Sequence, residues 1–147
     1  MTPARDTSLD LYIALSRASQ WVNAYADRDI RSYGLNRTEF GVLELLHHRG
    51  PQPIQKIGSK VLMSSGNITY VLDKLEQKKY VKRKASTTDR RLIYAEITAE
   101  GCEFMERVFP AHAQVLKQAV EGLTLKEQET VSKLLKQLGK HAQSNFR

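Results

Sequence analysis

Residues 64–98 constrain the fold most strongly, because they combine a helix-start signal, an amphipathic helix and two strand patterns. Ser64-Ser65-Gly66 opens the segment, and a serine hydroxyl there can accept hydrogen bonds from the free N–H groups of a first helical turn. Apolar side chains then recur at helical spacing over residues 67–79, at Ile68, Val71, Leu72 and Leu75. The spacing predicts a helix that packs through one face and leaves the other free to meet a partner.

Two short strand patterns follow this helix. Residues 80–84 and 92–97 contain the β-branched and aromatic side chains that are typical of short strands. The polar run 85–91 joins them. A short helix at 54–61 and a tight turn precede the longer helix, which is helix-turn-helix spacing. The segment therefore predicts a winged helix-turn-helix, within a mainly α fold that has a small β-hairpin wing.

The positive charge of the chain is concentrated in the same segment. Residues 54–91 carry ten Lys or Arg and three acids, a net charge of +7, which equals the net charge of the whole chain. The remaining basic and acidic residues therefore cancel. A charge run is usually a solvated face, but here it coincides with Asn, Ser, Thr and Arg side chains that can reach bases or phosphates. We therefore favour a nucleic-acid interface over a merely solvated one.

Composition excludes several other classes of protein. No apolar run approaches the roughly 18 residues that span a bilayer, and the N-terminus lacks the apolar core of a signal peptide, so we expect a cytoplasmic protein without a membrane partner. The single cysteine, Cys102, excludes an intrachain disulfide and a multi-cysteine zinc site. Glycine-rich phosphate loops, G-x-S-x-G and H-E-x-x-H are absent, so we expect neither an enzyme nor a cofactor.

Further helices are predicted on both sides of the winged segment. Residues 9–33 form a long aromatic-rich pattern that we expect to be buried, with Gly34 as its C-terminal cap. Asn36 and Glu39 resemble a capping box for a helix at 38–48. After the hairpin a helix begins near residue 99, and Pro110 is expected to kink or break it. Thr124 and Glu127 form a second capping box, and the tail from Gly139 is expected to be frayed.

The terminal helices carry more apolar side chains than a small wing domain can cover. We therefore expect residues 1–34 and 99–147 to form a homodimer around the DNA-binding unit at 35–98. Such a dimer would hold two recognition helices about 34–36 Å apart, the spacing of successive major grooves in a pseudo-palindromic duplex.

Several motifs in this order resemble the MarR family of bacterial transcription regulators. They are Gly34-Leu35-Asn36, Glu39-Phe40-x-Val42-Leu43, the helix from Ser64, the wing Thr88-Asp89-Arg90-Arg91, and Ile97-Thr98-x-x-Gly101. The resemblance implies that Arg91 enters the minor groove, that Asp89 orients the loop, and that residues 64–74 lie in the major groove. We expect the DNA contacts to come from Ser64, Ser65, Asn67, Thr69, Tyr70, Lys74, Arg83, Asp89, Arg90 and Arg91.

One position departs from the family pattern. Where the family often has glycine after the recognition helix, this chain has Lys79. A lysine fits a positive-φ cap less well than glycine, which leaves the geometry of this turn open. Within the family, residues 28–36 and 65–71 look most like the quinone-responsive MhqR type, which implies control of detoxifying oxidoreductase or dioxygenase genes in a stress response.

Two further sets of residues have competing interpretations. Trp21, Tyr25, Phe40 and His47 could line the aromatic-ligand pocket that the resemblance implies, although an aromatic stripe is more often core, which we favour. Cys102 lies near a helix N-terminus, where its thiol could act as a redox sensor, although a single cysteine is more often inert. His47 and His48 point roughly 100° apart on a helix, so we expect no metal site.

The sequence therefore predicts a homodimeric regulator of double-stranded DNA, a repressor released by a small phenolic or quinone-like ligand. Two alternatives stay open. The chain could be a thiol-based regulator that acts through Cys102, or a winged-helix module that binds proteins, although the Asp89-Arg90-Arg91 wing argues against the second.

Overall fold

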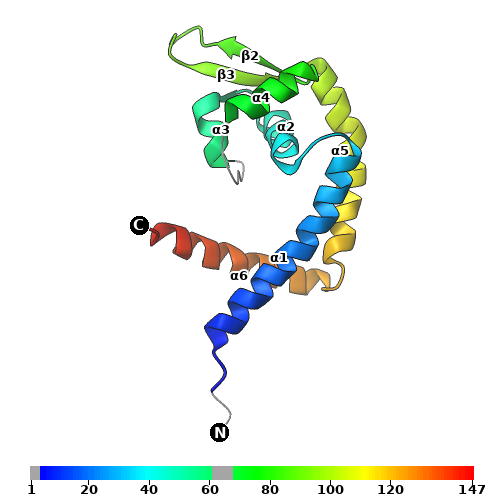
Figure 1. Ribbon diagram of the computed structural model, residues 1–147, viewed down its shortest axis with the longest axis vertical. Coiled ribbons are helices and arrows are strands. Elements are labelled where there is room, and N and C mark those ends of the chain that lie inside the picture. The colour runs from blue at the N-terminus through cyan, green and yellow to red at the C-terminus, as the bar shows by residue number, and fades with distance from the viewer. Residues whose placement is uncertain (1–3, 61–67) are drawn as a thin grey trace.

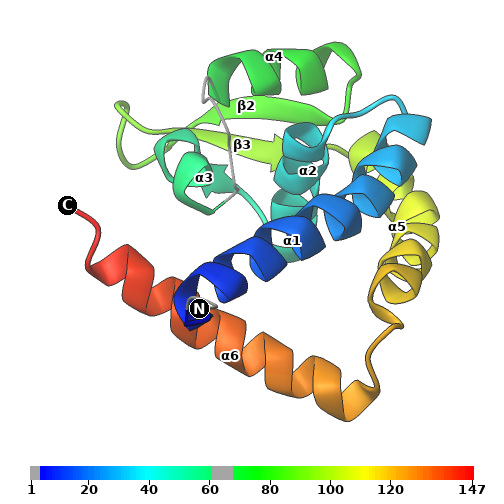
Figure 2. The same cartoon turned by 60° about the horizontal axis from the view of Figure 1, so that its bottom comes forward.

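The computed structural model describes residues 4–60 and 68–147 (Figure 1). The helices are α1 (Thr7–Ser32), α2 (Arg37–Arg49), α3 (Ile54–Lys60), α4 (Ile68–Gln77), α5 (Ala99–Val120) and α6 (Leu125–Ser144), and the strands are β1 (Gln52–Pro53), β2 (Val81–Ala85) and β3 (Ile93–Ile97). α2, α3, α4 and the sheet form one cluster, while α1 and α5 pack along each other and lead away from it (Figures 1 and 2). The predicted mainly α fold with a β-hairpin wing is confirmed.

The hairpin belongs to a three-stranded antiparallel sheet of order β1-β3-β2. In the hairpin Val81 pairs with Ile97 and Ala85 with Ile93, while Gln52 of β1 pairs with Ala95 on the other side of β3. The sequence did not predict β1, because a strand of two residues has no periodicity of its own. Its pairing depends on β3, which lies more than forty residues along the chain.

The core fills the space between α2, α4, the sheet and the first half of α5. Its fully buried side chains include Leu43, Ile57, Leu72, Leu75 and Met105. The apolar face predicted for α4 is confirmed, since Val71, Leu72 and Leu75 are buried and Ile68 packs against them. Burying a leucine side chain fully contributes about 1.5–3 kcal/mol, so this face fixes how α4 sits on the domain.

Local capping signals formed as the sequence predicted. Gly34 has a φ of 81°, and Gly34 N–H and Leu35 N–H donate to the carbonyls of Arg31 and Ile30, which closes the C-terminus of α1. Asn36 and Glu39 form a complete capping box on α2. Thr124 and Glu127 do the same on α6. The bonds in these motifs join residues that are close in the sequence, so the motifs could be predicted without knowledge of the tertiary fold.

Lys79 adopts the left-handed conformation that glycine favours, with a φ of 67°. Its N–H donates to Glu76 O at 2.9 Å, and Tyr80 N–H donates to Leu75 O at 3.0 Å. This is the same pair of bonds that closes α1 at Gly34, so the turn keeps the usual cap geometry despite the lysine side chain. Having lysine in place of glycine therefore strains the backbone at residue 79 but does not change the path of the chain.

The prediction that the first helix is buried was wrong. Ile30 is the one buried residue of α1, whereas Trp21 is 65% exposed and Tyr12 is 67% exposed. The apolar periodicity is present, but most of it faces away from the core of its own chain. Periodicity shows that a face will be covered and does not show which molecule covers it.

Two expectations for the last helices were also wrong. The break that was considered at Pro110 does not occur, since α5 continues through it, while a kink there stays a prediction. Pro110 is exposed, so water can satisfy the carbonyl that loses its donor. α6 continues through Gly139 to Ser144, because one internal glycine costs only about 1 kcal/mol and good helix formers follow it. Within residues 4–60 and 68–147 no helix is long and apolar enough to cross a membrane.

Candidate nucleic-acid interface

The exposed face of α4 carries polar and aromatic side chains. Thr69, Tyr70, Asp73, Lys74 and Gln77 are solvent-accessible on the side opposite to the buried leucines. The Lys74 ammonium lies 5.4 Å from the centre of the Tyr70 ring, a cation–π contact that keeps the two side chains together. The predicted contacts Ser64, Ser65 and Asn67 lie outside the described residues.

The tip of the wing is ordered by a small network of hydrogen bonds. Ser86 Oγ accepts from Thr88 N–H at 3.2 Å and from Asp89 N–H at 3.1 Å. Asp89 Oδ1 then accepts from Arg91 N–H at 3.0 Å and from Arg91 Nε at 3.3 Å. The Arg91 side chain is nevertheless 91% exposed. Asp89 thus orients Arg91 without removing it from solvent, and Arg90 beside it is exposed as well.

Arg83, another predicted DNA contact, points at α4. Its Nη1 donates to Glu76 Oε1 at 2.8 Å, and its Nη2 donates to Asp73 Oδ1 at 2.8 Å and to Thr69 O at 3.1 Å. The guanidinium therefore joins β2 to the recognition helix through two carboxylates and a carbonyl. This geometry gives Arg83 a positioning role, and a direct contact with DNA stays a prediction.

The four predicted ligand residues have very different surroundings. Phe40 is buried and its ring centre lies 4.7 Å from that of His112, so the core interpretation is confirmed for Phe40. It is wrong for Trp21 and Tyr25, both of which are exposed. His47 is half-buried, with a buried Nδ1 that has no hydrogen-bond partner among the described residues. The shared ligand pocket stays a prediction.

A buried polar cluster at the junction of α1 and α5 was not predicted. His112 is 4% exposed, and its Nδ1 lies 2.8 Å from Asp29 Oδ2, which also accepts from Tyr33 Oη at 3.0 Å. Burial and the neighbouring carboxylate raise the pKa of Tyr33. His112 and Asp29 are 83 residues apart, so no local pattern could have joined them.

The structure shows no additional reactive side chains around Cys102 among the described residues, and no group of metal ligands there either. Cys102 is half-buried in the first turn of α5. Its backbone N–H donates to Thr98 O at 2.9 Å, a bond that belongs to the helix. Within residues 4–60 and 68–147, no three His, Cys, Asp or Glu side chains lie together so that they could hold a metal ion.

An exposed helix after a short helix, beside a hairpin with arginines at its tip, defines a winged helix-turn-helix DNA-binding protein. Residues 35–93 match the model of the MarR family. The chain is 47% identical to the HTH-type transcriptional regulator MhqR of Bacillus subtilis over 137 residues, which covers 93% of this chain and 94% of that protein. The chain therefore belongs to the MarR family of DNA-binding transcription regulators, and it is not an enzyme.

Solved structures share this fold across nearly the whole chain. AbsC, a MarR family regulator from Streptomyces coelicolor, is 18% identical and superimposes with a TM-score of 0.86 over 99% of this chain and all of its own. Sco3205 from the same organism, solved in complex with DNA, is 22% identical and has a TM-score of 0.84 over 97% of this chain and 92% of its own. At these identities the likeness supports the arrangement of helices and wing.

Proposed function

We propose that the chain acts in the cytoplasm as a homodimeric repressor that binds a pseudo-palindromic duplex and is released by a small phenolic or quinone-like molecule. The exposed Arg91 at the wing tip, on the hairpin that packs against α4 and leaves its polar face exposed, is the observation that carries this proposal. The two elements present cations and hydrogen-bonding groups at once to the minor and major grooves of a duplex. The arrangement supports sequence reading by α4, with the wing fixing its register.

Homodimer formation is supported by the terminal helices. None of the residues of α6 is buried, although it carries an apolar face. Apolar side chains that are at least one third exposed on α1, α5 and α6 include Leu9, Leu11, Tyr12, Trp21, Leu116, Val120, Leu125, Val131, Leu134, Leu135 and Leu138. Soluble proteins rarely leave so extended an apolar surface uncovered, so we assign it to a second copy of the chain.

The domain division follows from the same argument. Residues 35–98 hold the helices and strands that face the duplex, and residues 1–34 and 99–147 hold the faces that we assign to the dimer. α5 links both parts, because it packs against α2 of the wing domain and also along α1.

Release by a phenolic or quinone-like ligand is the finer part of the proposal. It depends on the resemblance of residues 28–36 and 65–71 to the quinone-responsive type, and the 47% identity to MhqR agrees with that subgroup. Trp21, Tyr25 and His47 stay the proposed ligand contacts, whereas Phe40 belongs to the core, and the two exposed aromatic residues would need a partner subunit to enclose them.

Selection of bound duplexes from a random DNA pool tests the main proposal. We expect an inverted repeat whose half-sites are about one helical turn apart. Enrichment of no sequence, with binding that disappears as salt rises, would reduce the interface to a non-specific basic surface. It would also favour a protein-binding role for the winged helix.

A second experiment tests the release mechanism with the selected duplex. We expect 1,4-hydroquinone or 1,4-benzoquinone to weaken binding reversibly, and the Cys102→Ser variant to respond like the unaltered protein. Intact-mass measurement after treatment separates reversible binding from thiol modification. A covalent adduct at Cys102, with loss of the response in Cys102→Ser, would replace ligand release by thiol chemistry.

A further inference from the structure

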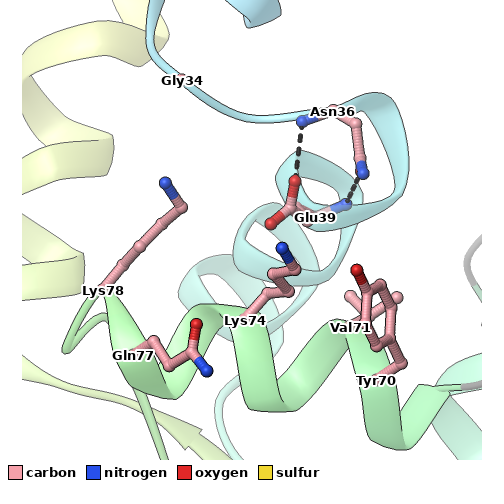
Figure 3. Close-up of a pocket in the computed structure, with 8 residues that line it drawn as sticks. All are labelled: Gly34, Asn36, Glu39, Tyr70, Val71, Lys74, Gln77 and Lys78. Carbon is pink, nitrogen blue, oxygen red and sulfur yellow. Dashed lines mark hydrogen bonds between the residues drawn. The ribbon is translucent and has the colours of Figure 1, made fainter.

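A cleft of about 340 Å³ separates α4 from the segment that joins α1 to α2 (Figure 3). Gly34, Asn36 and Glu39 line it on one side, and Lys74, Gln77 and Lys78 of α4 line it on the other. Thr69, Asp73 and Glu76, which hold Arg83, lie on the other flank of the helix. α4 therefore has the wing on one side and this cleft on the other.

Two ammonium groups reach into the cleft from α4. Figure 3 shows the side chains of Lys74 and Lys78 rising from the helix toward the segment at residues 34–39. A Cβ placed on Gly34 would lie 3.9 Å from Lys78 Nζ, so the ammonium lies close to that backbone. Among the described residues neither lysine forms a salt bridge with a carboxylate. Lys74 also lies over the Tyr70 ring, a contact that does not neutralise its charge, so both ammonium groups can meet an anion.

The acidic residue of the cleft, Glu39, is already engaged. It is 6% exposed, and its Oε1 accepts from Asn36 N–H at 2.9 Å in the capping box. Its negative charge also lies at the N-terminus of α2, where the helix dipole stabilises it. Glu39 is thus held below the surface, whereas Lys74, Gln77 and Lys78 are exposed on α4 at the opening.

The position of the cleft beside the recognition helix indicates which anion it would meet. A helix in a major groove lies between two sugar–phosphate backbones. If α4 enters the groove with the wing on one side, the second backbone passes the opposite flank, where Lys74 and Lys78 lie. We infer that this cleft binds a backbone phosphate of the DNA, through the ammonium groups of Lys74 and Lys78.

This inference depends on the proposed duplex binding and adds Lys78 to the residues expected at the interface. Lys78 is exposed, so replacing it should leave the fold intact. We expect Lys78→Gln to weaken binding of the selected duplex and to reduce the dependence of log K on log salt by about one unit. The preferred sequence should stay the same, because a phosphate contact carries no base information.

Lys126→Gln is the matched control, because it removes the same charge from an exposed site on α6, far along the chain from the wing domain. It should leave the salt dependence unchanged. Single methylphosphonate substitutions along the duplex locate the phosphate. One position should weaken binding by the unaltered protein and have no further effect on Lys78→Gln.

The outcomes separate the two proposals. If the unaltered protein enriches no duplex, the proposed function fails. If it binds its duplex and Lys78→Gln keeps the full salt dependence, only the phosphate site is overturned. Titration with inorganic phosphate provides the remaining comparison: saturation of the cleft by free phosphate, with no sensitive position in the methylphosphonate series, would overturn the assignment to the DNA backbone.

Discussion

Arg83 and Asp73 lie on different elements, β2 and α4, and their side chains meet with 2.8 Å between Nη2 and Oδ1. The same guanidinium bonds Glu76 and the carbonyl of Thr69, so one side chain contacts the recognition helix near both its first and its last residue. Because its five donors are held in a rigid plane, arginine can fix the angle between two elements as lysine cannot. The wing and the helix that we expect to contact neighbouring grooves are therefore coupled.

Removing this coupling should cost stability. The Arg83 side chain is 27% exposed, so its ion pairs are partly screened, and we expect Arg83→Met to lower the free energy of unfolding by about 1 kcal/mol. Lys82→Met is the control on the same strand, because Lys82 approaches Glu96 only to 3.9 Å. Urea denaturation measures both. Equal losses in the two variants would show that Arg83 does not brace the helix.

The cap after α4 gives a prediction in the opposite direction. Lys79 holds a φ of 67°, and a side chain in that conformation costs about 1–2 kcal/mol relative to glycine. We therefore expect Lys79→Gly to raise the free energy of unfolding by about 1 kcal/mol, with an unchanged denaturant slope. Lys79→Ala should give no such gain. If alanine stabilised as much as glycine, the benefit would come from removing the charge and the strain argument would be wrong.

The sequence predicted what short-range chemistry decides. Gly34, the Asn36–Glu39 box and the Thr124–Glu127 box were visible because every bond in them joins close neighbours. The burial of Val71, Leu72 and Leu75 followed from periodicity. The partners of Arg83 and the contact between His112 and Asp29 could not be predicted, because only the tertiary fold brings those side chains together. The predicted burial of Trp21 was wrong for another reason: periodicity identifies an apolar face but does not show whether the same chain or another chain covers it.

The ion pair between α1 and α2 predicts a pH dependence of stability. Arg37 donates to both carboxylate oxygens of Asp27, at 2.9 Å and 2.7 Å. These hydrogen bonds lower the pKa of Asp27 below its ordinary value, and burial opposes the shift only in part. A lowered folded pKa contributes stability above the unfolded pKa of about 3.9, and that contribution is lost as the pH falls through the folded value.

Asp27→Asn should accordingly melt at a lower temperature than the unaltered protein at pH 7. The difference should narrow as the pH is lowered below about 4, where Asp27 in the unaltered protein takes up its proton. Arg37→Gln should show the same convergence, because it removes the other partner. Thermal unfolding at a series of pH values measures the difference in melting temperature between each variant and the unaltered protein. A difference that stayed constant down to pH 3 would mean that the pair contributes no pH-dependent stability.

Arg91 at the wing tip should act on binding and hardly on stability, because its side chain is 91% exposed. We expect Arg91→Ala to weaken binding to all sequences and to reduce the salt dependence by about one unit, as loss of a backbone or minor-groove contact would. Thr69→Ala should instead change the preferred bases. Titrations of the selected duplex at several salt concentrations check both, and an unchanged salt dependence in Arg91→Ala would show the wing assignment to be wrong.

The assignment of the terminal helices to a dimer can be tested at Leu134. This side chain is 57% exposed on α6, so a glutamate costs the single chain little, whereas an interface would have to bury its charge. In a symmetric dimer the substitution occurs twice, so we expect Leu134→Glu to raise the dissociation constant by about a hundredfold or more. Gln137→Glu is the control, because it adds the same charge at an exposed position one turn along the helix.

Sedimentation measures the dissociation, and Trp21 reports on it independently as the single tryptophan of the chain. Its indole is 65% exposed in one chain, so covering α1 with a partner should shift its emission to shorter wavelength and protect it from a soluble quencher. Leu134→Glu should expose it again while circular dichroism stays that of a folded helical protein. Dissociation without any change at Trp21 would place the interface on α5 and α6 alone, and an unaltered protein that sediments as a monomer would leave two-fold DNA recognition without its physical basis.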